Sequence, residues 1–139
     1  MCLAREGAHK VAEAGGIDGI LAAMAQHRDS TKVQSDGCAA LGNVARYDVA
    51  RPIIAEKGGI EAAFRAMTQH SHHEGVQWYG CYMMSSMVGC ESARPAIREG
   101  KAVMDAARNN FPNNDNIKKY LKKVYAKCGI KAEKECSIC

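Results

Sequence analysis

Histidines and cysteines are the residues of this 139-residue chain whose types most readily support chemistry. Three histidines stand close together in His70-Ser71-His72-His73, and ligands three positions apart can reach one metal ion. A zinc site needs four well-placed ligands, however, and His27 occupies the equivalent place in an earlier segment without any cluster. We therefore interpret the run as a solvated loop between helices, and we predict neither a metal ion nor another cofactor.

The seven cysteines are scattered along the chain, and their odd number argues against a complete disulfide framework. Cys38 and Cys81 occupy one position of the repeat described below. Stacked helical units place such residues about 10 Å apart, whereas the Cα atoms of a disulfide lie within about 7 Å. We expect both residues to be small, buried core residues with free thiols.

The last four residues, Cys136-Ser137-Ile138-Cys139, loosely fit the C-terminal pattern for prenylation, with Cys136 as the modified residue. A single lipid chain holds a membrane weakly and needs a second signal. The seven lysines from Lys118 to Lys134 would supply that signal. The alternative interpretation is a flexible tail over residues 129–139 in which the cysteines are coincidental.

Nothing in the sequence indicates catalysis. It contains no glycine-rich phosphate loop, nucleophile elbow, zinc-protease motif or paired acid motif. With 47% hydrophobic and 24% charged residues, the composition is typical of a globular domain. No apolar stretch approaches the roughly 20 residues of a membrane-spanning helix, and the N-terminus lacks a signal-peptide core. We expect a cytoplasmic protein that is not an enzyme.

Positive charge is concentrated in the C-terminal part of the chain. Residues 1–100 carry 10 Lys and Arg against 11 Asp and Glu, whereas residues 101–139 carry 9 against 4. A nucleic-acid-binding protein would spread its cations over a groove or a face. The sequence therefore predicts no nucleic-acid partner, although the basic C-terminal segment makes membrane association an alternative.

An internal repeat with an interval of 43 positions is the strongest signal in the sequence. The recurring segments are Ala14-Gly15-Gly16-Ile17 with Lys57-Gly58-Gly59-Ile60, Val33-Gln34 with Val76-Gln77, Gly37-Cys38 with Gly80-Cys81, and Arg51-Pro52 with Arg94-Pro95. Each unit is predicted to hold three helices. The first is short and starts at a proline, the second follows a glycine turn, and the third is the longest, with apolar residues at helical spacing.

These units resemble armadillo repeats. Val11-Ala12-Glu13-Ala14-Gly15-Gly16-Ile17 and Ala39-Ala40-Leu41-Gly42-Asn43-Val44-Ala45 are similar to that family's glycine-bounded turn and third helix, and the period lies in its range of roughly 40–47 residues. The resemblance implies an all-α fold, a right-handed α-α superhelix of about three three-helix repeats. The armadillo-like domain would span residues 1–128, with repeats over about 8–46, 47–89 and 90–128.

The two ends of this array differ. The helix expected over residues 117–127 is amphipathic, as a closing helix of a solenoid must be. Residues 1–9 instead look like the tail of an earlier unit, and about three units are the minimum for a stable solenoid. We therefore expect this chain to be the C-terminal segment of a longer array, whose further repeats would cover the N-terminal face. The alternative is that a partner covers it.

The resemblance also implies a peptide-binding groove along the third helices, in which an aromatic residue stands four positions before an Asn. In successive units the Asn position reads Asn43, Ser86 and Gly129, and the aromatic position reads Ala39, Tyr82 and Tyr125. No unit carries both residues, which departs from the nuclear-import receptors. An alternative is that Asn43 only caps a turn. The predicted groove residues are Asn43, Tyr79, Tyr82, Ser86, Lys122 and Tyr125.

These observations predict a scaffold that binds a protein or an extended peptide. Tyrosines suit such a groove because each offers apolar area and a polar tip at a low cost in conformational entropy. The alternative function is a peripheral membrane adaptor, anchored by the basic C-terminal helix and a lipid on Cys136.

Overall fold

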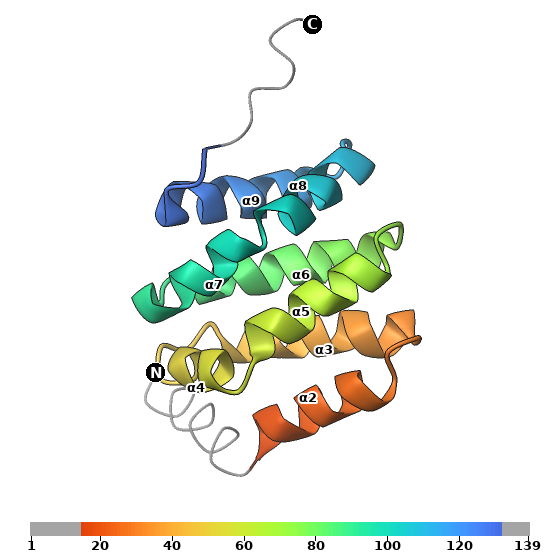
Figure 1. The fold of residues 1–139 in the computed structure, drawn as a ribbon, viewed down its shortest axis with the longest axis vertical. Helices are drawn as coiled ribbons and strands as arrows, with labels where there is room; N and C mark the ends of the chain where they lie inside the picture. The colour runs from red at the N-terminus through yellow and green to blue at the C-terminus, as the bar shows by residue number, and fades with distance from the viewer. Residues whose placement is uncertain (1–14, 132–139) are drawn as a thin grey trace, which may run out of the picture.

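A computed structural model describes residues 15–131, and every regular element in that range is helical (Figure 1). The elements are α2 (Gly16–Gln26), α3 (Thr31–Val44), α4 (Arg51–Glu56), α5 (Gly59–Gln69), α6 (Glu74–Met87), the short 3-10 helix η1 (Glu91–Ala93), α7 (Arg94–Glu99), α8 (Lys101–Asn110) and α9 (Asp115–Cys128). The predicted all-α class is confirmed for this part of the chain.

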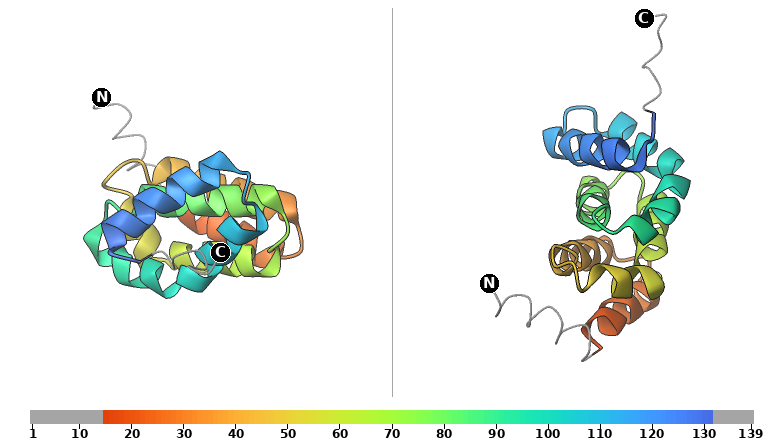
Figure 2. Two further views of the ribbon diagram at one scale, coloured as in Figure 1. Left: turned by 90° about the horizontal axis from the view of Figure 1, so that it is seen from above. Right: turned by 90° about the vertical axis from the view of Figure 1, so that its left-hand side faces the viewer.

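The helices stack as successive units of a solenoid. Helices α4, α5 and α6 form one unit and α7, α8 and α9 the next, while α2 and α3 belong to the unit before. Figure 2 shows the third helices α3, α6 and α9 in one column, with α2, α5 and α8 in a second column beside it. The first seven residues of the repeat predicted over 8–46 lie outside the described range.

One hydrophobic interior runs through the whole stack. It draws its side chains from all three units, and methionines fill much of it because their flexible thioethers fit irregular spaces. The largest fully buried side chains are Ile17, Leu41, Ile54, Ile60, Met67, Met83, Met84, Met87, Ile97, Met104, Ile117 and Leu121.

Glycines on the third helices let the second helices approach closely. A Cβ atom at Gly37 would lie 2.6 Å from Cγ of Met24, and one at Gly80 would lie 2.4 Å from Sδ of Met67. The two pairs are equivalent in successive units. Each methionine therefore lies in a notch that only glycine provides.

A buried glutamine joins the same two helices in each of these units. Gln34 donates from Nε2 to the carbonyl oxygens of Met24 (3.0 Å) and His27 (2.9 Å). Gln77 repeats both bonds with Met67 and His70, at 3.0 and 2.9 Å. The last carbonyls of a helix have no partner within the helix itself. The glutamine supplies that partner and fixes the end of the second helix against the third.

The repeat interval shortens in the last unit, which the sequence analysis did not anticipate. The N-cap residues of the third helices are Ser30, His73 and Asn114, and each side chain accepts a hydrogen bond from the backbone N–H three residues later. The first two caps are 43 positions apart, and the second and third are 41 apart. An interval of 43 therefore does not align α9 with α6.

Two small changes account for the missing residues. Gly100 alone separates α7 from α8, where Lys57 and Gly58 separate α4 from α5, and α8 has 10 residues where α5 has 11. The loop that follows is short, because α8 extends to Asn110 and α9 begins at Asp115. Gly129 ends α9 with a positive φ of 65°, as expected for a glycine that terminates a helix.

The predicted state of the repeated cysteines is confirmed. Cys38 and Cys81 are fully buried free thiols, and burial raises the pKa of each to about 12. Within the described range, no helix combines the length and apolar character needed to cross a membrane.

Replacing Gln77 with leucine should destabilise the protein by about 1–3 kcal/mol, because the buried carbonyl oxygen of Met67 loses its hydrogen-bond donor and that of His70 keeps only the backbone N–H of His73. Urea unfolding followed by circular dichroism measures the change. Gln26→Leu, at an exposed position of α2, is the matched control and should leave the free energy of unfolding within about 0.5 kcal/mol of its original value. Equal losses in both variants would contradict the assigned role of Gln77.

Cys38 and Cys81 should resist alkylation in the folded protein near neutral pH, because burial blocks the reagent and suppresses the thiolate that reacts. Iodoacetamide labelling followed by peptide mass spectrometry measures the modification of each cysteine. Of these three cysteines, we expect Cys90, which is only partly buried, to react first. Cys38 and Cys81 should react only after denaturation. Rapid labelling of Cys81 in the folded protein would show that the interior is open.

Candidate functional site

Tyr82 lies at the centre of the exposed face formed by α3, α6 and α9, which we call the third-helix face. Its hydroxyl group donates a 2.7 Å hydrogen bond to Oδ1 of Asn43 in the preceding unit. Its ring packs against Tyr120 of the following unit, with centroids 5.5 Å apart and planes at 56°. A Cβ atom at Gly42 would lie 2.6 Å from the Tyr82 ring. Gly42 therefore lets the ring lie flat across α3.

The other predicted residues of α3 and α6 also belong to this face. Asn43 is exposed and engages Tyr82 through its side chain, so it is more than a cap for its own turn. Ser86 is half-buried, one helical turn beyond Tyr82, and its hydroxyl donates to the Tyr82 carbonyl at 3.3 Å. Tyr79 is 39% exposed, with its ring stacked on Trp78 at 6.1 Å between centroids.

The structure corrects the predicted positions of Lys122 and Tyr125. Tyr125 is only 6% exposed, and its hydroxyl group donates a 2.5 Å hydrogen bond to Asp105 of α8. The Arg108 guanidinium carbon lies 5.7 Å from the centroid of the same ring. Lys122 and Tyr125 line a separate cavity of about 280 Å³, together with Arg108, Lys118, Leu121 and Ile130. Neither residue lines the cavity that contains Tyr82.

The shortened repeat explains the error. Counting 43 positions from Tyr82 gives Tyr125, whereas the caps align Tyr82 with Lys123, 41 positions later. In the same way Ser86 aligns with Lys127 and Tyr79 aligns with Tyr120. Two lysines one helical turn apart thus occupy the aromatic and Asn positions of the last unit, to which Tyr125 and Gly129 had been assigned.

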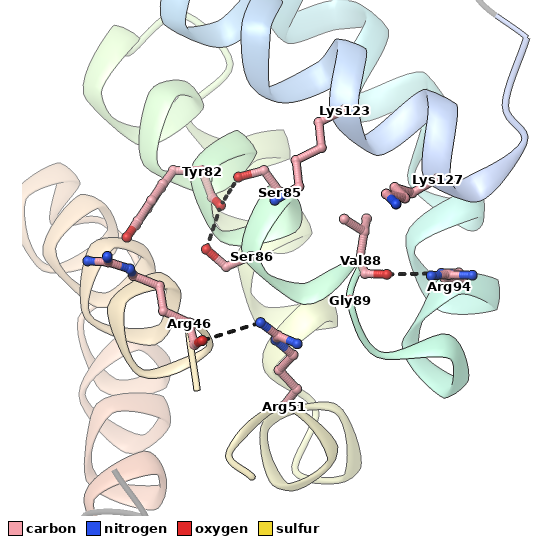
Figure 3. Close-up of a pocket in the computed structure, with 10 residues that line it drawn as sticks. All are labelled: Arg46, Arg51, Tyr82, Ser85, Ser86, Val88, Gly89, Arg94, Lys123 and Lys127. Atoms are coloured by element: carbon pink, nitrogen blue, oxygen red, sulfur yellow. Dashed lines mark hydrogen bonds between the residues drawn. The ribbon is translucent and has the colours of Figure 1, made fainter. Parts of the chain in front are cut away.

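These lysines complete a cavity of about 500 Å³, which we call the cationic pocket (Figure 3). It lies across the C-terminal halves of α6 and α9 and the residues that follow α3, and it reaches the first residues of α4 and α7. Five of its lining residues are cationic. The lining residues are Arg46, Arg51, Tyr82, Ser85, Ser86, Val88, Gly89, Arg94, Lys123 and Lys127.

Two of the arginines are fixed by the backbone of the unit before them. Arg51 donates from Nε to the carbonyl oxygen of Ala45 at 2.6 Å, and Arg94 donates from Nε to that of Val88 at 2.9 Å. Both carbonyls belong to the cap residue at the C-terminus of a third helix. Cations are favourable there because the helix dipole places partial negative charge at that end. The repeated Arg-Pro pairs therefore position guanidinium groups at the pocket.

No carboxylate group lines the cationic pocket, and none forms an ion pair with its five cations within residues 15–131. The hydroxyl groups in the pocket donate within the protein, since Ser85 and Ser86 donate to the Tyr82 carbonyl at 2.7 and 3.3 Å. The side-chain donors that remain are cationic. This arrangement favours negatively charged groups.

Comparison with known proteins adds nothing to this geometry, since no protein-family model, no curated protein and no solved structure matches the chain.

The histidine-rich loop has structural roles. Nε2 of His70 lies 2.7 Å from the carbonyl oxygen of Arg28 in the preceding unit, and Nδ1 of His73 accepts the hydrogen bond that caps α6. Across residues 15–131, no three His, Cys, Asp or Glu side chains are grouped closely enough to hold a metal ion. The predicted lipidation site, Cys136, lies outside the described residues.

Sequence reasoning missed Arg46, Arg51, Arg94, Lys123 and Lys127. The signal that was present is the repeated Arg-Pro pair, which was interpreted only as a helix start. The spacing of the N-cap residues would have revealed the shortened interval, because Ser30, His73 and Asn114 each precede a β-branched aliphatic residue by three positions.

Tyr125→Phe should destabilise the protein by about 1 kcal/mol, because it removes the hydroxyl that binds Asp105. Tyr79→Phe is the matched control and should change stability little, since that side chain is exposed. Chemical denaturation near neutral pH measures both. A larger effect for Tyr79→Phe would contradict the assignment of Tyr125 to the contact between α8 and α9.

The contact between Asp105 and Tyr125 should also make the stability of the fold depend on pH. Burial alone would raise the pKa of Asp105, but hydrogen bonds from Lys101 and Tyr125 and the charges of Lys101 and Arg108 lower it below its ordinary value. The carboxylate therefore stabilises the fold above the unfolded-state pKa of about 4, and this contribution is lost as the pH falls through the folded-state pKa. Denaturation at a series of pH values measures this dependence. As the pH falls, the free energy of unfolding of Asp105→Asn should decrease less steeply than that of the original protein. An unchanged slope would contradict this role.

Proposed function

We propose that this chain is a non-catalytic interaction scaffold whose third-helix face binds an extended segment of a partner protein. The observation that supports this most strongly is the cationic pocket, because it is assembled from third helices of successive units and from the residues that follow them. We propose also that the units are armadillo-type repeats wound as a right-handed superhelix, and that the protein acts in the cytoplasm.

The spacing of the units suits an extended chain. Packed helices are about 8–10 Å apart, and an extended chain advances about 3.3 Å per residue. A bound segment would therefore present about three residues to each unit. Tyr79 and the Tyr82–Tyr120 pair offer it aromatic contacts, and the cationic pocket offers charge.

Binding accounts for the chemistry of the pocket better than catalysis does. Nucleophilic hydroxyl groups need an adjacent general base, and the pocket lining contains neither a histidine nor a carboxylate. Ser85 and Ser86 donate to a backbone carbonyl instead. An arrangement of cations without a histidine or a carboxylate can attract and orient a ligand.

The membrane adaptor receives less support from the arrangement of α9. Its lysines do not form one flat face, because Lys123 and Lys127 line the cationic pocket whereas Lys118 and Lys122 line the cavity beside Tyr125. Lys123 and Lys127 share their cavity with three arginines, whereas a planar membrane surface would be met best by cations on one face.

Site-specific photo-crosslinking tests the scaffold function. A benzophenone amino acid would replace Ser86 or Tyr79 on the third-helix face, and Ala22 or Ala106 at exposed positions of the second helices would serve as controls. After irradiation in extract from the source cells, mass spectrometry identifies the crosslinked segments. We expect Ser86 and Tyr79 to crosslink to one contiguous segment of a common partner, with little reaction at the controls. Equal crosslinking at all four positions, or unrelated products at Ser86 and Tyr79, would overturn the proposal.

A further inference from the structure

We propose that the cationic pocket receives a phosphate group carried by the bound segment, namely a phosphorylated serine or threonine side chain. This inference rests on the proposed scaffold function and names the chemistry that the scaffold recognises. It is carried by the number and origin of the five cations in one cavity and by the fixed positions of Arg51 and Arg94.

The cations come from four parts of the chain and from every described unit. Arg46 follows α3, Arg51 and Arg94 begin α4 and α7, and Lys123 and Lys127 lie one turn apart on α9. Like charges that share a cavity repel one another. Since no carboxylate from the described part of the chain enters the pocket, a bound anion would be the group that offsets this repulsion.

A phosphate monoester fits the pocket better than a single carboxylate. It carries a charge of about −1.5 to −2 near neutral pH and has three acceptor oxygens, so guanidinium and ammonium groups can bind it from several directions at once. A carboxylate has two oxygens and one charge. Five cations around a cavity of about 500 Å³ match the ligand with the greater charge and the greater number of acceptors.

Arg51 and Arg94 are positioned before any ligand arrives. Besides its bond to Ala45, Arg51 donates from a terminal nitrogen to the carbonyl oxygen of Arg46 at 3.3 Å. Its guanidinium group also lies so close to Gly89 that a Cβ atom there would be 2.5 Å from a terminal nitrogen. Fixed donors lose little conformational entropy on binding. The backbone contacts also offset the negative helix ends, which would otherwise repel an anion.

The shape of the site favours a single phosphate on a peptide over a polyanionic surface. Nucleic acids are bound through many phosphate contacts distributed along a groove, and membranes through cations on an accessible face. Here the cations converge on one recess that also contains Tyr82, whose ring packs against Tyr120. That combination suits one phosphorylated side chain flanked by ordinary peptide residues.

Binding of degenerate peptide libraries to the full-length chain tests the proposal. Three fluorescent nonapeptide libraries would differ only at the central residue, which is phosphoserine, serine or glutamate, and fluorescence anisotropy measures the dissociation constants at about 0.15 M salt. Vesicles of phosphatidylcholine, with and without a phosphoinositide, form a separate arm. The proposal predicts that the phosphoserine library binds at least about tenfold more tightly than the serine library, a difference of about 1.4 kcal/mol.

Two double variants of α9 provide matched controls. Lys123→Glu with Lys127→Glu reverses the charge at the cationic pocket, and Lys118→Glu with Lys122→Glu makes the same change on the other side of the helix. All four lysines are exposed, so both variants should fold, which circular dichroism verifies. We expect the first variant to lose the preference for phosphoserine and the second to keep it. The milder Lys123→Gln with Lys127→Gln should weaken it part-way.

The outcomes separate this inference from the scaffold function. If all three libraries bind equally and the Lys123 and Lys127 variants have no effect, the phosphate inference fails while crosslinking at Ser86 and Tyr79 still decides the scaffold function. If phosphoinositide vesicles bind more tightly than the phosphoserine library, the pocket belongs to a membrane site and the inference is overturned. If the Lys118 and Lys122 variant loses the preference instead, the site has been assigned to the wrong face.

Discussion

The contact between the second and third helices of each unit is the constraint on which the rest of this structure depends. In the middle unit, Gly80 admits the Met67 side chain, and Gln77 caps the end of α5. Both residues lie on α6, so this one helix determines how closely α5 approaches it and how the two helices are aligned. The last unit has Leu121 and Lys118 in the corresponding places. It joins α8 to α9 instead through Asp105, which binds Lys101, Arg108 and Tyr125.

This change in the last unit determines the chemistry of the third-helix face. Because α9 is displaced by two positions in the repeat, Tyr125 turns inward to α8, and Lys123 and Lys127 face the neighbouring units. The third-helix face therefore carries Asn43 on α3, Tyr82 on α6 and two lysine ammonium groups on α9. The Arg-Pro pairs add guanidinium groups at the same level, since their side chains are held by the ends of the third helices. The pocket depends on how α9 is aligned with α6 as much as on which residues the last unit contains.

The sequence predicted the features that depend on short-range pattern. The helices and the buried cysteines follow from identities repeated at 43 positions, and these predictions are confirmed. The placement of Lys122 and Tyr125 was wrong because one interval was applied beyond Gly100, where a residue is lost from the turn and another from α8. Sequence identity could not reveal this, since the motifs fade there. The pocket could not be foreseen either, because its cations meet only when three units stack. The right-handed superhelix, the peptide partner and a lipid on Cys136 stay predictions.

The most direct test of this account is the nuclear Overhauser effect between ring protons of Tyr82 and those of its neighbour on α9. With selectively labelled tyrosine, and with Tyr120→Phe and Tyr125→Phe to assign the signals, the two alignments of α9 give different neighbours. The account predicts a cross-peak between Tyr82 and Tyr120, whose ring centroids are 5.5 Å apart, and none between Tyr82 and Tyr125. A cross-peak with Tyr125 alone would restore the uniform interval of 43 positions and remove Lys123 and Lys127 from the pocket.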